Sequence, residues 1–355
     1  MNKRNDLIDI VKGIGIVSIV VGHAVLSIFN GKLPIGHFAY TYHLMIFMFV
    51  IGFLFNKEKF NSDSNYKYKY ISKQLFKLLI MYFLYNLVFV LGHNLFVKFN
   101  LINADYIDLN KMIFLIFNSL TFSTKEKLLG AFWFIPMMIF AKIIFVISYS
   151  KKLFKKDILN LLLYLVITGG IGLALCMNSA FIAYHIQISF LGTSVIYLGV
   201  IANDYEDKLS KYITKYLWII VAIIIFIILI LTGKHIDLSA NKVINPFMFY
   251  LYTILGITFC FSLAKFISSI KFINKLFTTF GINSFHIMAL HLLVFKIIDF
   301  IYSKINNIND INIISNLPTS YHKLWPLYII LGVIIPVIVI IPFKYINKKL
   351  KITDI

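Results

Sequence analysis

One apolar stretch near the start of the chain carries three ionisable residues. Residues 7–29 are long enough to cross a bilayer as a helix, and they include Asp9, Lys12 and His23. A charged side chain at the centre of a membrane helix costs about 2.5–3.5 kcal/mol on insertion scales, so such residues mark functional sites. A lysine can bind an anionic ligand, and a histidine can accept or donate a proton. Together they indicate acid–base chemistry on a bound ligand.

The spacing places Lys12 and His23 on one face of this predicted helix. They are 11 residues apart, which at about 100° per residue returns to within about 20° of the same direction, about 16 Å further along the axis. The face therefore presents an ammonium group near one membrane surface and an imidazole nearer the other. Taken singly, Lys12 could extend to the interface and His23 could be a buried structural histidine.

Further candidates stand at the ends of the next two predicted spans. His43 lies near the outer end of the second span, where a short connection would bring it to the depth of His23, although an interfacial histidine is the structural alternative. Lys73 and Lys77 begin the third span and share a helix face at the depth of Lys12. Together the three lysines could bind a polyanionic cofactor from the cytoplasm. The usual enrichment of Lys and Arg at the cytoplasmic ends of membrane spans also explains Lys73 and Lys77.

Two later segments add polar and aromatic candidates. Trp133 opens the fourth span, where an aromatic belt is the ordinary explanation. Asn283 and His291 fall inside the predicted ninth span, with His291 about 20 Å from its inner end; Asn283 could instead hydrogen-bond a neighbouring helix. No three His, Cys or acidic residues have metal-ligand spacing, so no metal is predicted. The remaining candidates are interpreted as loop or interface histidines: His93, His185, His235 and His322.

The composition is that of an all-α integral membrane protein. The chain has 355 residues, of which 60% are hydrophobic and 14% charged, and its mean hydropathy is +0.85. We predict a single domain over residues 1–355, one bundle of about ten transmembrane helices, without an appended soluble domain. A short apolar stretch at 112–120 suits an interfacial helix. The predicted spans are 7–29, 39–56, 75–97, 130–149, 158–177, 186–202, 216–232, 246–264, 277–300 and 325–343.

The distribution of positive charge predicts the orientation. The formal net charge is +19, and 21 of the 34 Lys and Arg residues fall in segments on one side of the predicted spans. Because cytoplasmic loops are enriched in Lys and Arg, this asymmetry predicts that both termini are cytoplasmic. The excess base then faces membrane lipids with anionic headgroups, and no nucleic-acid partner is predicted.

These residues resemble a known family. Asp9, Lys12, Gly13 and His23, with ten residues between base and histidine, resemble the signature of the membrane-bound acyltransferase-3 family. The resemblance extends over nearly the whole chain. Four segments are similar to the branch that contains fucose-4-O-acetylase-like proteins: Tyr42–Phe55, Phe132–Pro136, Leu191–Gly199 and Tyr252–His291. Lysine stands at 73 and 77 where the family commonly has arginine, and an ammonium group binds phosphate only as a point charge.

The resemblance implies an O-acyltransferase in a bacterial cell membrane. Such an enzyme moves an acyl group, usually acetyl, from acyl-coenzyme A to a hydroxyl of a cell-surface polysaccharide or a lipid-linked sugar. By position, His23 is the essential histidine and Lys12 its basic partner. We expect Lys12, Lys73 and Lys77 to hold the phosphates of coenzyme A while His23 removes the hydroxyl proton.

The remaining roles follow from the same mechanism. We expect Asp9 to orient Lys12, and His43 or His291 to stabilise the oxyanion. Asn283 and Trp133 are the further candidates for contact with substrate or oxyanion. Four small residues along the first predicted span are expected to leave room beside the helix for the pantetheine arm: Gly13, Gly15, Ser18 and Gly22.

Two alternatives belong to other functional classes. A transporter or flippase of lipid-linked sugars would use the intramembrane ionisable residues as a proton relay, and it would depend on a proton gradient but not on acyl-coenzyme A. A non-catalytic subunit of a glycan-synthesis complex would carry a degenerate site.

Overall fold

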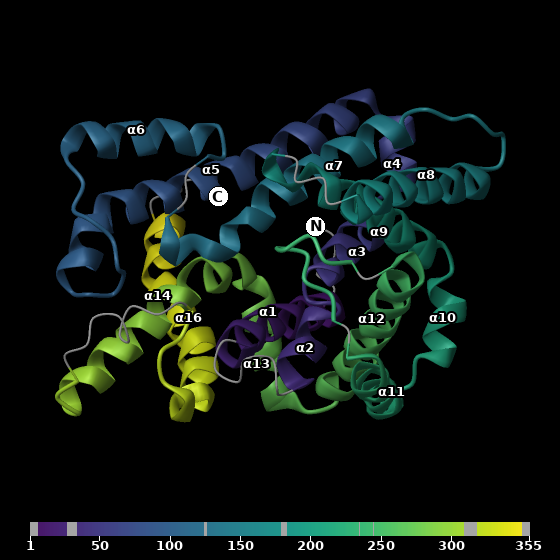
Figure 1. Cartoon of the computed structure of the whole chain (residues 1–355). Coiled ribbons are helices and arrows are strands. Elements are labelled where there is room, and N and C mark those ends of the chain that lie inside the picture. The colour runs from purple at the N-terminus through teal and green to yellow at the C-terminus, as the bar shows by residue number, and fades with distance from the viewer. Residues whose placement is uncertain are drawn as a thin grey trace. The chain divides into compact units, whose positions relative to one another are not determined.

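A computed structural model describes residues 6–26, 34–123, 126–178, 183–233, 235–243, 245–308 and 318–349, and nearly all of them are helical (Figure 1). The first half of the chain forms α1 (Asp6–Leu26), α2 (Pro34–Tyr40), α3 (Met45–Phe53), α4 (Lys57–Ser62), α5 (Ser64–Lys98), α6 (Leu109–Leu120), η1 (Lys127–Trp133), α7 (Phe134–Tyr149) and α8 (Asp157–Met177). The second half forms η2 (Ala183–His185), α9 (Ile186–Asp204), α10 (Glu206–Tyr212), α11 (Leu217–Thr232), α12 (Pro246–Ser268), α13 (Lys271–Ile282), α14 (Ser284–Ile305), η3 (His322–Leu324) and α16 (Trp325–Lys349).

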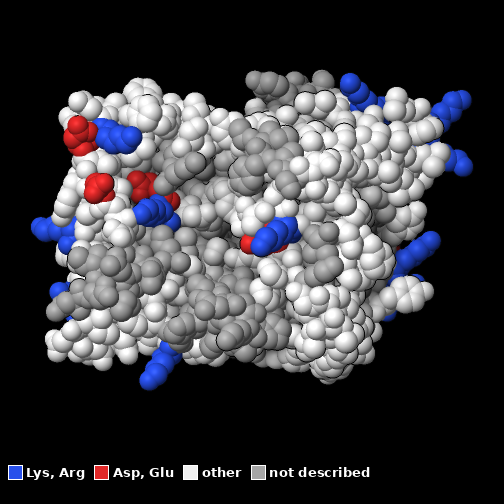
Figure 2. Space-filling model, viewed as in Figure 1, with Lys and Arg blue, Asp and Glu red and all other residues white. Residues whose placement is uncertain are grey.

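The chain is an all-α, multi-pass membrane protein, as its composition predicts. Nine helical stretches of the described residues are long and apolar enough to cross a membrane. The face drawn in Figure 2 is largely uncharged, with scattered charged side chains. The stretches are Asp6–Val25, Ile35–Phe53, Ser72–Lys98, Lys127–Tyr149, Asp157–Met177, Ile186–Asp204, Pro246–Ser268, Ser284–Ile305 and Trp325–Pro342. Residues 27–29 of the first predicted span lie outside the described residues, and the cytoplasmic position of both termini stays a prediction.

Two predicted spans need correction. The span predicted at 216–232 is α11, which has only 16 residues and follows α10 at an angle of 80°, so a tenth crossing requires the two helices to form one broken span. The span predicted at 277–300 begins at Ser284, because Asn283 separates α13 from α14. Polar residues that recur every three or four positions make α13 amphipathic, and its Phe, Ile and Leu residues gave the sequence an apolar appearance.

The described residues group into two compact units. The first unit comprises Met1–Gly15, His37–Leu78 and Trp133–Ile282, and the second comprises Ile16–Gly36, Leu79–Phe132 and Asn283–Ile355. Both α1 and α5 contribute residues to each unit. The single domain over residues 1–355 stays a prediction.

Within the first unit, α9 is the central helix. It packs against α3, α7 and α8, while α11 packs against α12. Glycines let α3 and α9 approach until their backbones touch: a Cβ at Gly52 would meet the carbonyl oxygen of Ile196, and one at Gly199 would meet that of Phe49. Small residues at helix crossings are the usual means of close packing in membranes, where the lipid gives no hydrophobic drive to associate.

Within the second unit, α14 packs against α16. A Cβ at Gly332 of α16 would lie 2.6 Å from the Phe295 ring of α14, so this crossing also needs a glycine. The stretch predicted as an interfacial helix forms α6, whose N-terminus is capped by the Asp108 side chain. Leu109 and Phe117 of α6 are 71% and 64% exposed, and this unburied apolar face fits the predicted interfacial position.

Candidate active site

The second unit places the histidine of α1 beside a histidine of α14. The ring centroids of His23 and His291 are 5.2 Å apart and their planes are tilted by 32°. His291 is fully buried, whereas His23 is half-buried. Residues far apart in the sequence therefore form an imidazole pair inside two membrane helices, with one ring accessible and the other enclosed.

The hydrogen bonds of His291 define its tautomer. Its Nδ1 donates to the carbonyl oxygen of Ile287 at 3.0 Å, so the proton of the neutral ring is on Nδ1. Nε2 is then an acceptor, and it is buried without a hydrogen-bond partner. Buried polar atoms are nearly always paired, so this acceptor beside His23 is a position where a hydrogen-bond donor fits.

Asn283 connects to the same histidine through the helix backbone. It stands directly before α14 and is buried, and its carbonyl oxygen accepts from the amide of Ile287, the residue whose own carbonyl holds His291. Because α14 begins at Ser284, His291 lies only seven residues after the first residue of its helix. This is about 10 Å along the axis, whereas about 20 Å was predicted from a span beginning at residue 277.

Aromatic residues from three segments line the beginning of α14. A 2.7 Å hydrogen bond joins the Tyr85 hydroxyl of α5 to Nδ1 of His286. The Phe132 ring lies 5.8 Å from Tyr85 and 5.7 Å from Phe285, each edge to face. The sequence analysis singled out neither Tyr85 nor His286, because residues so far apart in the chain show no pattern that would pair them.

In the first unit, Lys12 forms an ion pair with Asp9, one helical turn earlier. The Nζ to Oδ1 distance is 2.6 Å, and the side chains are 26% and 5% exposed. Asp9 is thus positioned to orient Lys12, while the ammonium group keeps a surface that a ligand can reach.

Gly13 and Gly15 of α1 do not leave room for a ligand, contrary to the sequence prediction for these two residues. A Cβ at Gly13 would meet the carbonyl oxygen of Phe277 in α13, and one at Gly15 would lie 2.8 Å from the Ile46 side chain. In the reverse direction, a Cβ at Gly281 would meet the carbonyl oxygen of Asp9. These glycines bring α13 and α3 against α1, so they fix the helix that carries Lys12.

The other predicted residues of the first unit lie in two further places. Lys73 and Lys77 are exposed on α5. His43 is 6% exposed, its Nδ1 donates to the carbonyl oxygen of Ala39 at 3.0 Å, and its ring lies 4.5 Å from that of Tyr40.

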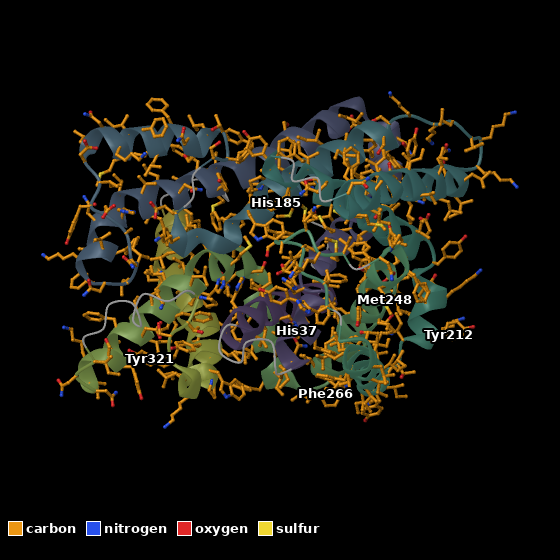
Figure 3. The ribbon with its side chains drawn as sticks, viewed as in Figure 1. His37, His185, Tyr212, Met248, Phe266 and Tyr321 are labelled. Atoms are coloured by element: carbon orange, nitrogen blue, oxygen red, sulfur yellow. The ribbon has the colours of Figure 1, made fainter. Side chains whose placement is uncertain are left out.

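Trp133 has a histidine neighbour, His185, which was predicted from the sequence to be a loop or interface residue. Its ring lies 4.5 Å from that of His185, which stands directly before α9 and is labelled in Figure 3. Burial lowers the pKa of His185, which favours the neutral imidazole beside the indole. The pair places an indole and an imidazole together where α7 and α9 begin.

A fully buried ion pair in the second unit was also missed. Lys296 and Asp299 of α14 are both 0% exposed. Ser320 accepts from Lys296 at 2.9 Å and donates to Asp299 at 2.8 Å, and the Tyr328 hydroxyl donates to the other carboxylate oxygen. Ionisable residues inside an apolar span are the sequence feature that marks such a pair.

The residues that could hold a ligand are therefore lysines and histidines. Among the described ranges, no three His, Cys, Asp or Glu side chains gather as they would around a metal ion. The ammonium group of Lys12 and those of Lys73 and Lys77 suit a phosphate, and the imidazole pair suits a hydroxyl that must lose its proton.

Comparison with known proteins gives one match. A family model described as an acyltransferase domain matches residues 5–345. No curated protein and no solved structure matches the chain. The matched range includes every residue of the imidazole pair, its aromatic neighbours and the lysines of the first unit.

Proposed function

The chain belongs to the acyltransferase-3 family, because the match covers nearly all of it, and from this membership we propose an O-acyltransferase that uses acyl-coenzyme A. The acyl group, most simply acetyl, goes to a hydroxyl of a cell-surface polysaccharide or a lipid-linked sugar in the bacterial cell membrane. The observation that carries the proposal is the pair of His23 and His291, with an open acceptor nitrogen inside the membrane helices.

In the proposed reaction, His23 is the general base. The acceptor hydroxyl attacks the thioester carbonyl carbon, a carbon–oxygen bond forms, and the carbon–sulfur bond breaks. His23 takes the hydroxyl proton and gives it to the departing thiolate, so the ring ends the cycle neutral. The half-buried position of His23 supports this role, since the base must reach a substrate and still exclude bulk water.

We assign His291 a positioning role in place of the oxyanion role expected from the sequence. Its single N–H in the neutral form is committed to the carbonyl of Ile287, so it has none to donate to an oxyanion. Its Nε2 can accept the N–H of His23 and so direct the other ring nitrogen of His23 toward the hydroxyl. This is the logic of a base oriented by a third group.

The lysines of the first unit supply the donor site in this proposal. Lys12 is held by Asp9 and remains partly exposed, and Lys73 and Lys77 present two ammonium groups on α5. The phosphates of coenzyme A carry several negative charges, and each charge-assisted hydrogen bond is about twice as strong as a neutral one. The assignment to the fucose-4-O-acetylase-like branch stays a prediction.

The decisive experiment measures acyl transfer by the purified protein in nanodiscs. The substrates are radiolabelled acetyl-coenzyme A and a lipid-linked sugar extract. Replacing a general base lowers the rate about 10²–10⁴-fold, so we expect His23→Ala to lose that much of kcat and to keep its membrane insertion and thermal stability. His291→Phe should lose less, because His23 can still accept a proton without its positioning neighbour.

A histidine elsewhere provides the control. His235→Asn changes a residue beyond the helical spans and should keep ordinary activity. Unchanged kcat in His23→Ala would remove the base role. Transport of lipid-linked sugar driven by a proton gradient, with no use of acetyl-coenzyme A, would favour the flippase instead.

A further inference from the structure

The first unit contains a membrane lysine that the sequence analysis did not use. Lys142 lies on α7, inside the span Lys127–Tyr149, and its side chain is half-buried. Its Nζ donates to Oε1 of Gln74 on α5 at 3.0 Å. Among the ion pairs of the described residues, none includes Lys142.

This arrangement is costly for a lysine in a span. Charged side chains inside membrane segments normally pair with an opposite charge or line a functional path. Lys12 and Lys296 both have a carboxylate one turn away on their own helix. Lys142 has no such carboxylate and instead contacts the neutral amide of Gln74 on a different helix. Its positive charge therefore stays available for an anion.

Gln74 stands between two further lysines. Lys73 is its chain neighbour, and Lys77 follows three residues later, so Gln74 and Lys77 are neighbours on the helix surface with about 5–6 Å between their Cβ atoms. Both lysines are exposed. The contact with Gln74 therefore brings the ammonium group of Lys142 to the part of α5 that already carries two ammonium groups.

We propose that Lys142, Lys73 and Lys77 form one phosphate-binding site between α5 and α7. Three like charges on one part of the protein repel one another, and a ligand with phosphate groups relieves this repulsion. Gln74 holds Lys142 in position through its side-chain carbonyl oxygen. The site needs no residue outside the first unit.

Two sources supply this phosphate chemistry. One is the diphosphate and ribose phosphate of coenzyme A, and this choice rests on the proposed function. The other is the headgroup of an anionic phospholipid. A surface lysine pair holds either one weakly, whereas a third cation from a neighbouring helix fixes the position of the phosphate.

The test compares variants of the full-length protein in nanodiscs. Calorimetry measures binding of coenzyme A to wild type, Lys142→Met and Lys142→Arg in uncharged lipid. We expect Lys142→Met to weaken binding by about tenfold to a hundredfold, the value of one hydrogen bond to a charged group. Lys142→Arg keeps the charge and should stay within a few-fold of wild type. Thermal unfolding checks that each variant is folded.

Lys151→Met is the matched control. Lys151 lies two residues after the end of α7 and is exposed, so its loss removes one positive charge nine residues after Lys142. It should leave binding unchanged. A second arm measures the stabilisation that phosphatidylglycerol gives relative to phosphatidylcholine, in the same set of variants.

The two arms separate the possible outcomes. Weaker coenzyme A binding in Lys142→Met assigns the site to the acyl donor. Lost phosphatidylglycerol stabilisation with no coenzyme A binding by wild type keeps the site, assigns it to a lipid headgroup and refutes the proposed function. If wild type binds coenzyme A and Lys142→Met equals it in both arms, the site is refuted while the proposed function stands.

Discussion

Lysines inside the membrane spans have opposite environments in the two units. In the second unit, Lys296 is completely enclosed and shares Asp299, Ser320 and Tyr328 in a closed set of hydrogen bonds. In the first unit, Lys12 is paired but 26% exposed, and Lys142 has only an amide. The hydrogen bonds of Lys296 are all made within the protein, whereas Lys12 and Lys142 can still donate hydrogen bonds to a ligand.

The difference separates structural charge from ligand-binding charge. Both carboxylate oxygens of Asp299 accept hydrogen bonds, so this pair has no site left for a ligand. Removing one partner of a buried pair leaves an uncompensated charge, whereas removing both is often neutral. The lysines of the first unit that remain accessible should behave in the reverse way. Replacing one of them should have a smaller effect on stability and a larger effect on ligand binding.

The largest expected effect is on the closed pair. Lys296→Met or Asp299→Leu alone should destabilise the protein by about 3–5 kcal/mol, because the remaining charge stays buried. The double variant should recover most of that stability, since two apolar side chains replace the pair. Thermal unfolding in detergent measures all three variants together with wild type.

Acyl transfer by the double variant sharpens the comparison. Retained activity confirms that the pair is structural. A stable but inactive double variant would break the comparison and place Lys296 and Asp299 in the chemistry.

A smaller effect is expected for Lys12. Lys12 is 26% exposed but its partner Asp9 is only 5% exposed, so Lys12→Ala leaves a buried carboxylate without its partner and should lose some stability, although less than either single variant of the fully buried pair. The KM for acetyl-coenzyme A should rise about tenfold, the effect of losing one charge-assisted contact. Asp9→Asn should raise KM less, because it frees the side chain of Lys12 but keeps its charge. A lower kcat at unchanged KM would instead place Lys12 in the chemical step.

Much of the fold could be predicted from the sequence, because length and hydropathy determine which segments can cross a bilayer. The errors lie where local pattern and tertiary packing disagree. The break at Asn283 does have a local signal, since Gly281, Asn283 and Ser284 are residue types that often end or begin helices. The apolar residues on both sides nevertheless made the stretch resemble one continuous span. The bend before α11 depends on how a short polar helix packs.

The site was predictable at the level of residue types and spacing on α1. Partners from distant segments were not, because hydropathy and periodicity say nothing about which helices are neighbours. The hydrogen bond between Tyr85 and His286 joins residues 201 positions apart. The glycines of α1 show the same limit: a small residue can leave a space or bring a helix close, and only the position of α13 shows which occurs.

The smallest expected effect concerns a second closed pair in the second unit. His93, assigned from the sequence to a loop or interface, is buried in α5. Its Nε2 donates to the carbonyl oxygen of Asp105 at 3.1 Å, and its Nδ1 lies 3.0 Å from Oε1 of the buried Glu126. These contacts hold the segment before α6, through Asp105, and the segment after α6, through Glu126, against α5. The role of the pair is therefore structural, by the same reasoning as for Lys296.

Glu126 gives this role a pH signature. Burial raises the pKa of Glu126 above its ordinary value of 4.5, against the opposing effects of His93 and Lys127. A carboxyl group whose pKa is higher in the folded state binds protons more readily there. Its contribution to stability is therefore complete below pH 4.5 and is lost as the pH rises through the raised pKa. Glu126→Gln imitates the protonated form and cannot titrate, so wild type minus variant should show a difference in melting temperature that falls with rising pH. A difference that rises with pH would mean that the ion pair with His93 outweighs burial, and Glu126 would then resemble the carboxylates that a lysine or histidine keeps charged.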